Sequence, residues 1–178
     1  MAGEGLEPKA SIYEVDGTRI QVIEEDNNKD GKYDTKITIL QREGEYNVKT
    51  EADTDLNGKL DYAQIMRYTY HTDGTIKQAF TVVDREGDKK IDLRGRRFVR
   101  EHPDYPGQIL DEVVEIDKNG NSKADYLVEV RRDRKSGRIT NVKMEKLTDG
   151  IEEVKGKEIA EVWKLLNEII EQYRPEFR

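Results

Sequence analysis

Residues 19–40 read "RIQVIEEDNNKDGKYDTKITIL" and contain two short apolar runs joined by an acidic loop. The runs are rich in β-branched residues that alternate with polar ones, a pattern typical of strands. The loop, "DNNKDGKYD" at 26–34, has side chains with oxygen atoms at positions 1, 3, 5 and 9 and a glycine at position 6. This unit recurs along the chain, and its recurrence decides the fold.

Three further copies of the loop follow, "DTDLNGKLD" at 53–61, "DREGDKKID" at 84–92 and "DKNGNSKAD" at 117–125. Their spacing of roughly 30 residues indicates a repeat architecture. Every copy has aspartate at positions 1 and 9, an oxygen-bearing side chain at positions 3 and 5, and lysine at position 7. Chance does not explain agreement at so many positions, so the four loops are copies of one structural element.

Short turns of glycine, aspartate or proline lie between the acidic loops, for example "REGE" at 42–45 and "HTDG" at 71–74. The chain therefore reads as strand, short turn, strand, acidic loop, and then repeats. We predict a mainly β fold, an antiparallel up-and-down meander or barrel of about ten strands built from hairpin repeats of about 30 residues. Alternate connections of a meander fall on opposite ends, so all four acidic loops should lie at one end.

The C-terminal segment changes from strand to helix character. Asp149 and Glu152 have the spacing of a capping box, and apolar residues follow at helical intervals before Pro175 ends the pattern. The apolar residues are Ile159, Val162, Trp163, Leu166, Ile169, Ile170 and Tyr173. We predict three segments: a disordered or tag-like N-terminus (1–10), a β-repeat domain (11–150) and one amphipathic helix (151–178) that covers an open side of the sheet.

The loop spacing suits calcium. A Ca²⁺ ion takes about 6–8 oxygen ligands, and a winding chain presents side chains from positions 1, 3 and 5 and a backbone carbonyl from position 7. Position 9 can reach the ion directly or through water, glycine at position 6 permits the turn, and the apolar residue at position 8 should point into the protein. The candidate ligands are Asp26, Asn28, Asp30, Lys32 and Asp34; Asp53, Asp55, Asn57, Lys59 and Asp61; Asp84, Glu86, Asp88, Lys90 and Asp92; and Asp117, Asn119, Asn121, Lys123 and Asp125.

The loops resemble the D-x-[DN]-x-[DN]-G-x-x-D calcium loops of integrin-type propeller, thrombospondin type 3 and dockerin repeats. The first two copies match this pattern throughout. The copy at 117–125 has Ser122 in place of the glycine and contains two carboxylates. The copy at 84–92 has Lys89 in place of the glycine and the longer Glu86 at position 3. The resemblance implies up to four Ca²⁺ ions as the cofactor.

A helix-loop-helix EF-hand does not fit, because its loop ends in a bidentate glutamate at position 12. The corresponding residues are Ile37, Gln64, Gly95 and Val128. Without that glutamate, the affinity of the loops for Ca²⁺ should be low, with Kd values of about 10⁻⁴–10⁻³ M, as in extracellular calcium-binding modules.

Composition limits the classes of function. The formal net charge of −7 argues against nucleic acid as a partner, and no apolar run is long enough to cross a membrane. The chain has no cysteine and 39% charged residues, a composition that resembles that of proteins from thermophiles. The N-terminus lacks the apolar core of a signal peptide, so the protein is either intracellular or an exported protein without its signal; we expect an extracellular, periplasmic or cell-surface location.

Other chemistry has little support in the sequence. The two histidines, His71 and His102, lack metal-binding spacing, and no nucleophile or phosphate-loop motif is present. We therefore expect a non-enzymatic calcium-binding protein in which metal stabilises one end of the fold for contact with a protein, a glycan or another copy. The alternative is a lipocalin-like barrel that binds a small ligand, with metal-free polar turns. Arginines in "RGRRFVR" at 94–100 should pair with acids of neighbouring strands.

Overall fold

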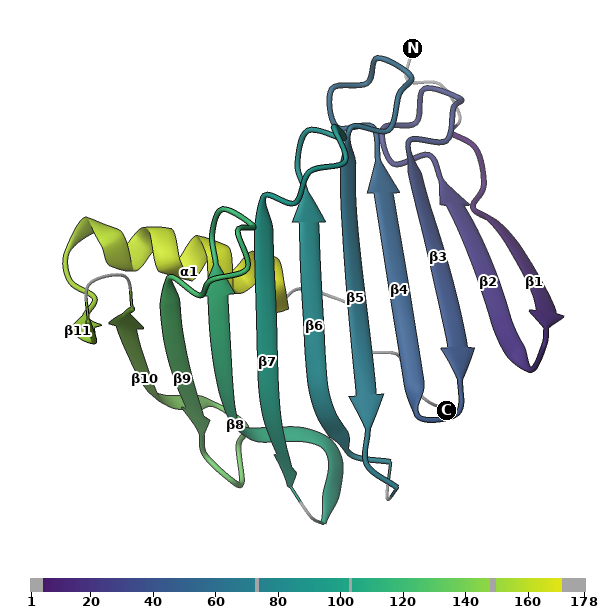
Figure 1. Cartoon of the computed structure of the whole chain (residues 1–178). Helices are drawn as coiled ribbons and strands as arrows, with labels where there is room; N and C mark the ends of the chain where they lie inside the picture. Colours follow the sequence, from purple (N-terminus) through teal and green to yellow (C-terminus); the bar gives the residue numbers. More distant parts are fainter. Residues whose placement is uncertain (1–4, 73, 103, 148–149, 171–178) are drawn as a thin grey trace.

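The computed structural model describes residues 5–72, 74–102, 104–147 and 150–170, which form one antiparallel sheet and one helix (Figure 1). The eleven strands lie side by side in sequence order, each paired with the next. The elements are β1 (Lys9–Val15), β2 (Thr18–Glu25), β3 (Thr35–Arg42), β4 (Glu45–Ala52), β5 (Tyr62–Tyr70), β6 (Ile76–Asp84), β7 (Leu93–His102), β8 (Tyr105–Asp117), β9 (Tyr126–Arg132), β10 (Ile139–Lys146), β11 (Glu152–Glu153) and α1 (Lys157–Ile170).

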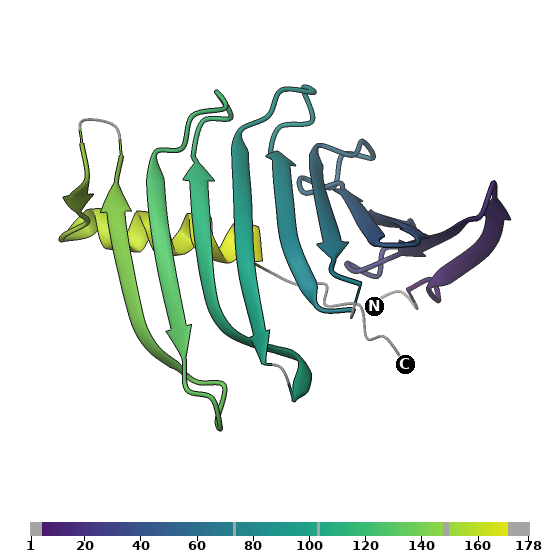
Figure 2. The same cartoon turned by 60° about the horizontal axis from the view of Figure 1, so that its bottom comes forward.

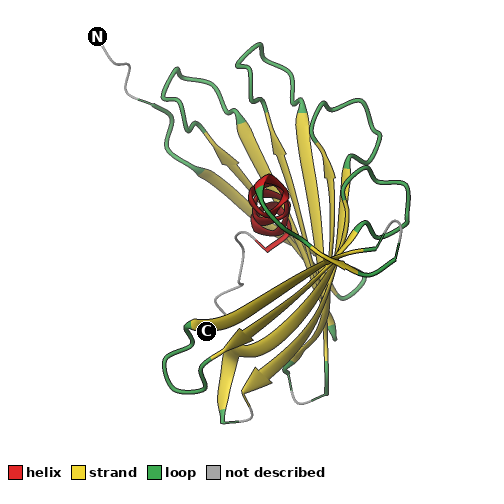
Figure 3. Ribbon diagram, turned by 90° about the vertical axis from the view of Figure 1, so that its left-hand side faces the viewer, coloured by secondary structure: helices red, strands yellow, loops and turns green. Residues whose placement is uncertain are grey.

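The sheet is open, with β1 at one edge and β11 at the other. The predicted up-and-down meander is confirmed, and the predicted alternative of a closed barrel is wrong. The sheet curves strongly, and α1 lies on its concave side (Figure 3). Part of the apolar face that a barrel would enclose is thus buried by the helix instead, and the two edge strands do not meet.

The four acidic loops join β2 to β3, β4 to β5, β6 to β7 and β8 to β9. All of them lie at the same end of the sheet, at the top of Figure 1, and the short turns lie at the opposite end. This polarity follows from the meander, because each pair of antiparallel strands returns the chain to the end from which it started.

The core lies on the concave face in two clusters. One cluster joins β6–β10 to α1 and includes Val83, Leu93 and Val128 from the sheet with Val162 and Leu166 from the helix. The other covers β3–β6 and consists of Ile37, Tyr46, Val48, Met66, Tyr68 and Ala79. Figure 2 shows α1 running across the strands of the first cluster. The helix therefore covers one half of the concave face, as predicted.

A glycine in β7 allows the helix to approach the sheet. A Cβ atom at Gly95 would lie 2.6 Å from Cγ1 of Ile169, closer than atoms pack. At the same end of α1, the side-chain amide of Gln64 donates to the carbonyl of Glu168 (2.9 Å), and the hydroxyl of Thr81 donates to that of Ile169 (3.3 Å). These two bonds join the last described turn of α1 to β5 and β6.

The start of the helix differs from the prediction. The predicted capping box is wrong, because Glu152 belongs to β11, where it pairs with Lys146 of β10. Asp149, Tyr173 and Pro175 lie outside the described residues. Gly156 has a φ of +63°, which ends the extended backbone, and α1 then begins at Lys157.

The buried stripe of α1 is also shifted from the one that the sequence indicated. Val162, Leu165, Leu166 and Ile169 are its buried residues, so Leu165 joins the core, whereas Ile159 is 38% exposed. At the other end of the chain, β1 begins at Lys9, inside the segment 1–10 that the sequence predicted to be disordered or tag-like.

Arginines on the convex face pair with acids of the next strand, as expected from the sequence. Arg96 contacts Glu115 (3.6 Å), and Arg100 forms an ion pair with Asp111. Arg94 lies opposite Asp117 in the register of β7 and β8. Arg96 and Arg100 thus have acidic partners on the convex face, and Arg97 of the same run lies on the concave face, where it pairs with Glu112.

Candidate metal centre

The four acidic loops have the same backbone closure. In each, the N–H of position 9 donates to the carbonyl of the residue just before position 1, across 2.7–3.0 Å. The donors are Asp34, Asp61, Asp92 and Asp125. Each loop is therefore a nine-residue connection that is closed by the same backbone hydrogen bond between two paired strands. Side chains at the same position of different loops are held at corresponding places.

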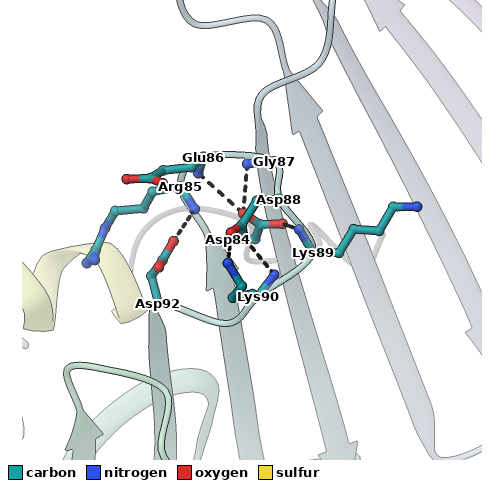
Figure 4. A network of polar contacts seen from close by, with 8 residues as sticks. All are labelled: Asp84, Arg85, Glu86, Gly87, Asp88, Lys89, Lys90 and Asp92. Carbon is teal, nitrogen blue, oxygen red and sulfur yellow. Dashed lines mark hydrogen bonds and ion pairs between the residues drawn. The ribbon is translucent and has the colours of Figure 1, made fainter.

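The aspartate at position 1 organises the interior of each loop. Its carboxylate accepts the N–H of position 6 in all four loops, from Gly31 (2.9 Å), Gly58 (2.6 Å), Lys89 (2.8 Å) and Ser122 (2.6 Å). It also accepts an N–H from position 4 or 5. Figure 4 shows this arrangement around Asp84. All four of these aspartates are buried, although they stand in surface loops.

The oxygen-bearing side chains at positions 5 and 9 also accept backbone N–H groups. The residue at position 5 accepts the N–H of the lysine at position 7 in every loop (2.8–2.9 Å). The aspartate at position 9 accepts the N–H of position 2 (2.7–3.0 Å). A carboxylate oxygen has more than one acceptor site, so an oxygen that accepts an N–H can still coordinate a cation.

Positions 4 and 6 have positive φ in every loop. At position 6 these are Gly31, Gly58, Lys89 and Ser122, and at position 4 they are Lys29, Leu56, Gly87 and Gly120. The first two loops thus place glycine at position 6, and the last two place it at position 4. The departures from the calcium-loop pattern at Lys89 and Ser122 therefore leave the backbone path unchanged.

Glycine at position 4 has a second role in the last two loops. A Cβ at Gly87 would lie 2.8 Å from Cα of Asp61, and a Cβ at Gly120 would lie 2.6 Å from the carbonyl carbon of Ile91. Each of these loops therefore packs its position 4 against the end of the preceding loop. The first two loops are linked differently, because the N–H of Asp53 donates to the carbonyl of Asp34 (2.8 Å). The four loops form a continuous row.

Hydrogen bonding keeps several loop carboxylates ionised. The N–H of Leu6 lowers the pKa of Asp26, with smaller effects from loop N–H groups, and the N–H and hydroxyl of Thr54 lower the pKa of Asp61. Burial alone would raise the pKa of Asp34, but bonds from Asn28, Thr35 and Asn27 outweigh it and lower the pKa. Loops 26–34 and 53–61 therefore carry negative charge at neutral pH.

The structure brings one trio of predicted ligands together. Oxygen atoms of Asp53, Asp55 and Asp61 all lie within 4.8 Å of one another, and no other set of three acids or histidines in the described part of the chain does so. In loop 84–92 the ammonium of Lys90 pairs with Asp88, one of the candidate ligands of the same loop. In loops 26–34, 53–61 and 117–125, asparagine amides belong to the set of candidate oxygen ligands.

The expectation for position 8 is wrong in the first two loops. Tyr33 is 39% exposed and Leu60 is 44% exposed, whereas Ile91 and Ala124 are half-buried. The physical reason for Ile91 is the loop stacking described above, in which Gly120 packs on its carbonyl. Tyr33 instead lies at the surface, where its hydroxyl donates to the carbonyl of Glu7 (3.2 Å).

Sequence reasoning missed a charged cluster in the concave face. Glu112, 1% exposed, accepts from Arg97 (2.6 and 3.0 Å) and from Arg132 (2.8 Å). Burial alone would raise the pKa of Glu112, but the arginines outweigh it and lower the pKa. Side chains alternate between the two faces of a strand, so Arg97 lies on the same face as Leu93, and Glu112 on the same face as Ile116. The alternation of residues in the sequence could therefore have placed both charged side chains on the buried face.

Comparison with protein-family models, with curated protein sequences and with solved structures found no match. Within the described ranges, no helix has the length and apolar character to span a membrane.

Proposed function

We propose that this chain is a non-enzymatic calcium-binding β-repeat protein in which up to four Ca²⁺ ions stabilise the acidic-loop end of the sheet for structural, adhesive or assembly contacts. The observation that carries the proposal is the trio of Asp53, Asp55 and Asp61, whose oxygen atoms lie within 4.8 Å of one another. Carboxylate oxygens at this separation are suited to one hard cation.

The common backbone of the loops supports extending the proposal to the other copies. The same N–H bonds and the same positive φ values recur at corresponding positions, so a geometry that suits an ion in one loop is available in the others. The clustering of oxygen atoms and the match to the calcium-loop pattern then rank the loops. Loop 53–61, whose three carboxylates lie together, should bind first. Loop 26–34, which also matches the pattern throughout, should follow, and loops 84–92 and 117–125, which depart from it, should bind last.

Calcium would act on the fold through charge. Aspartates in a continuous row of loops repel one another, and screening by salt is weak over the distance between neighbouring loops. Four bound ions would more than offset the formal net charge of −7. Affinities of about 10⁻⁴–10⁻³ M would match extracellular calcium better than cytosolic calcium, which favours an extracellular, periplasmic or cell-surface location.

The test is thermal unfolding in calcium and in chelator. If Kd is about 1 mM, calcium at about 10 mM adds about 1.4 kcal/mol of stability per occupied site. For a chain of 178 residues this raises Tm by about 3–6 °C per site. Magnesium at the same concentration controls for ionic strength, and it should shift Tm less because it requires a stricter octahedral shell.

Asp55→Asn is the matched test variant. The amide retains an oxygen that can accept the N–H of Asn57, so the loop should fold, but the variant removes one negative ligand. Because the variant removes one of the repelling charges, we expect a Tm in chelator no lower than that of the parent, and a smaller rise with calcium. Lys59→Ala is the control, because only its carbonyl is proposed to bind. A rise that is equal in Asp55→Asn and in the parent would exclude this loop as a site.

A further inference from the structure

β1 forms a long and regular edge of the sheet. β1 pairs with β2 over seven consecutive residues, Lys9–Val15, with no bulge, and among the described strands none pairs with its outer side. All seven residues are exposed. Ile12 is 57% exposed, Tyr13 49% and Val15 50%. A regular strand edge with apolar side chains is a template for another strand.

The opposite edge is protected in the ways that proteins use to prevent such pairing. β11 has two residues, Glu152 and Glu153, and both are exposed acids. Short length and charge both discourage strand addition. β1 has neither protection: no proline interrupts Lys9–Val15, and its charged residues, Lys9 and Glu14, stand near its two ends. β11 pairs only with Glu145 and Lys146, so among the described strands much of β10 also has an open outer side, but that stretch is irregular between Ile139 and Asn141 and carries Lys143, both of which discourage pairing. β1 is the longer regular edge without such protection.

We propose that two copies of this chain pair through β1 to form a two-fold symmetric dimer with a continuous antiparallel sheet. Antiparallel pairing of a strand with its own copy requires a two-fold axis perpendicular to the sheet, which keeps the same face of both copies on one side. Residues that lie opposite one another must then differ by an even number of positions. Centring the axis on Ile12 satisfies this condition and pairs all seven residues of β1.

That register also suits the side chains. Ile12 lies opposite Ile12 of the second copy, Ser11 opposite Tyr13, Ala10 opposite Glu14 and Lys9 opposite Val15. No like charges lie directly opposite one another, and the two Tyr13 rings are diagonal neighbours within aromatic reach. The register therefore covers the most exposed apolar residues of the edge and places no two like charges opposite each other.

Charge favours the dimer over a head-to-tail chain of copies. Lys9 lies at the acidic-loop end of β1, since it pairs with Glu24 next to loop 26–34, and Val15 lies at the turn end. The antiparallel dimer therefore places the acidic loops of the two copies at opposite ends. Pairing β1 with the part of β10 that β11 leaves uncovered on another copy would continue the meander and align all acidic loops at one end. Two chains of net charge −7 repel less in the dimer.

Sedimentation velocity in chelator tests the dimer separately from the calcium proposal. We expect a monomer–dimer equilibrium that persists without calcium. Ile12→Lys places two lysines opposite one another at the axis and should weaken dimerisation by at least about tenfold. Ile65→Lys is the matched control, because Ile65 is 41% exposed in β5, between two neighbouring strands, and its substitution should leave the equilibrium unchanged. A monomer at every concentration, or assembly beyond a dimer, would overturn the proposal.

Cysteine cross-linking tests the register. The chain has no native cysteine, so Ile12→Cys and Ser11→Cys each introduce a single thiol. Under mild oxidation Ile12→Cys should form disulfide-linked dimers faster than Ser11→Cys, because only residue 12 lies opposite its own copy. Faster cross-linking of Ser11→Cys would show that the axis lies elsewhere and would overturn the proposed register.

Discussion

Gly120→Ala should destabilise the protein far more than Gly31→Ala, because the two glycines have different surroundings. Both have positive φ, +70° and +87°, a conformation that costs alanine about 1–2 kcal/mol. At Gly31 an added Cβ meets nothing within 4 Å. At Gly120 it would contact the backbone of Ile91, whose carbonyl carbon would be 2.6 Å away.

The extra cost at Gly120 follows from that contact. Backbone atoms cannot rotate away as a side chain can, so loop 117–125 must move off loop 84–92. Overpacking of this kind costs about 1–3 kcal/mol. We therefore expect a total loss of about 2–5 kcal/mol for Gly120→Ala and about 1–2 kcal/mol for Gly31→Ala.

Urea unfolding followed by Trp163 fluorescence measures both losses, because Trp163 of α1 packs against the core that joins helix and sheet. In thermal unfolding the two variants should differ by about 2–12 °C in Tm, given about 2–4 °C per kcal/mol for a domain of this size. Equal losses in the two variants would refute the stacking of the loops and leave positive φ as the sole effect.

The remaining predictions concern the concave face. Glu112→Gln leaves Arg97 and Arg132 without their buried counter-charge. It should therefore reduce the free energy of unfolding by about 3–5 kcal/mol, measured by urea titration at neutral pH. A loss below about 1 kcal/mol would show that the cluster is solvated. Because the folded-state pKa of Glu112 is lowered from 4.5, its stabilisation is complete above the unfolded-state pKa and is lost as pH falls through the folded-state value. The parent should therefore lose more stability than Glu112→Gln between pH values of about 6 and 3, and parallel losses would contradict this role. Gly95→Ala should cost about 1–3 kcal/mol through its contact with Ile169, and Ile169→Ala should cost less in that background than in the parent; strictly additive losses would argue against the contact.

The sequence predicted the order and pairing of the strands because each strand is short, alternates in hydrophobicity and is bounded by a loop of fixed length. An antiparallel meander also determines that the four acidic loops lie at the same end of the sheet. Closure was not predictable, because the same alternation suits an open sheet and a barrel, and the outcome depends on how α1 packs against the concave face. The alternation likewise did not reveal β11, whose two residues form a strand only because β10 lies beside them.

The candidate site was predictable in its residue types but not in its geometry. Repetition identified the ligand positions. In the sequence, the last two loops depart from the calcium-loop pattern because their glycine is at position 4 instead of position 6, and only the backbone shows that both positions have positive φ. Packing between loops was hidden for the same reason, because Gly120 and Ile91 belong to different repeats. The grouping of Asp53, Asp55 and Asp61 depends on rotamers that spacing alone does not determine.

The most direct test of the central claim is a crystal structure grown in calcium, with anomalous scattering used to identify the ion. The account predicts an anomalous peak in loop 53–61 that is coordinated by Asp53, Asp55 and Asp61 at about 2.3–2.6 Å, with further peaks in the order of loop ranking. Loops without anomalous density at saturating calcium, with the carboxylates still bonded to their own backbone N–H groups, would contradict it.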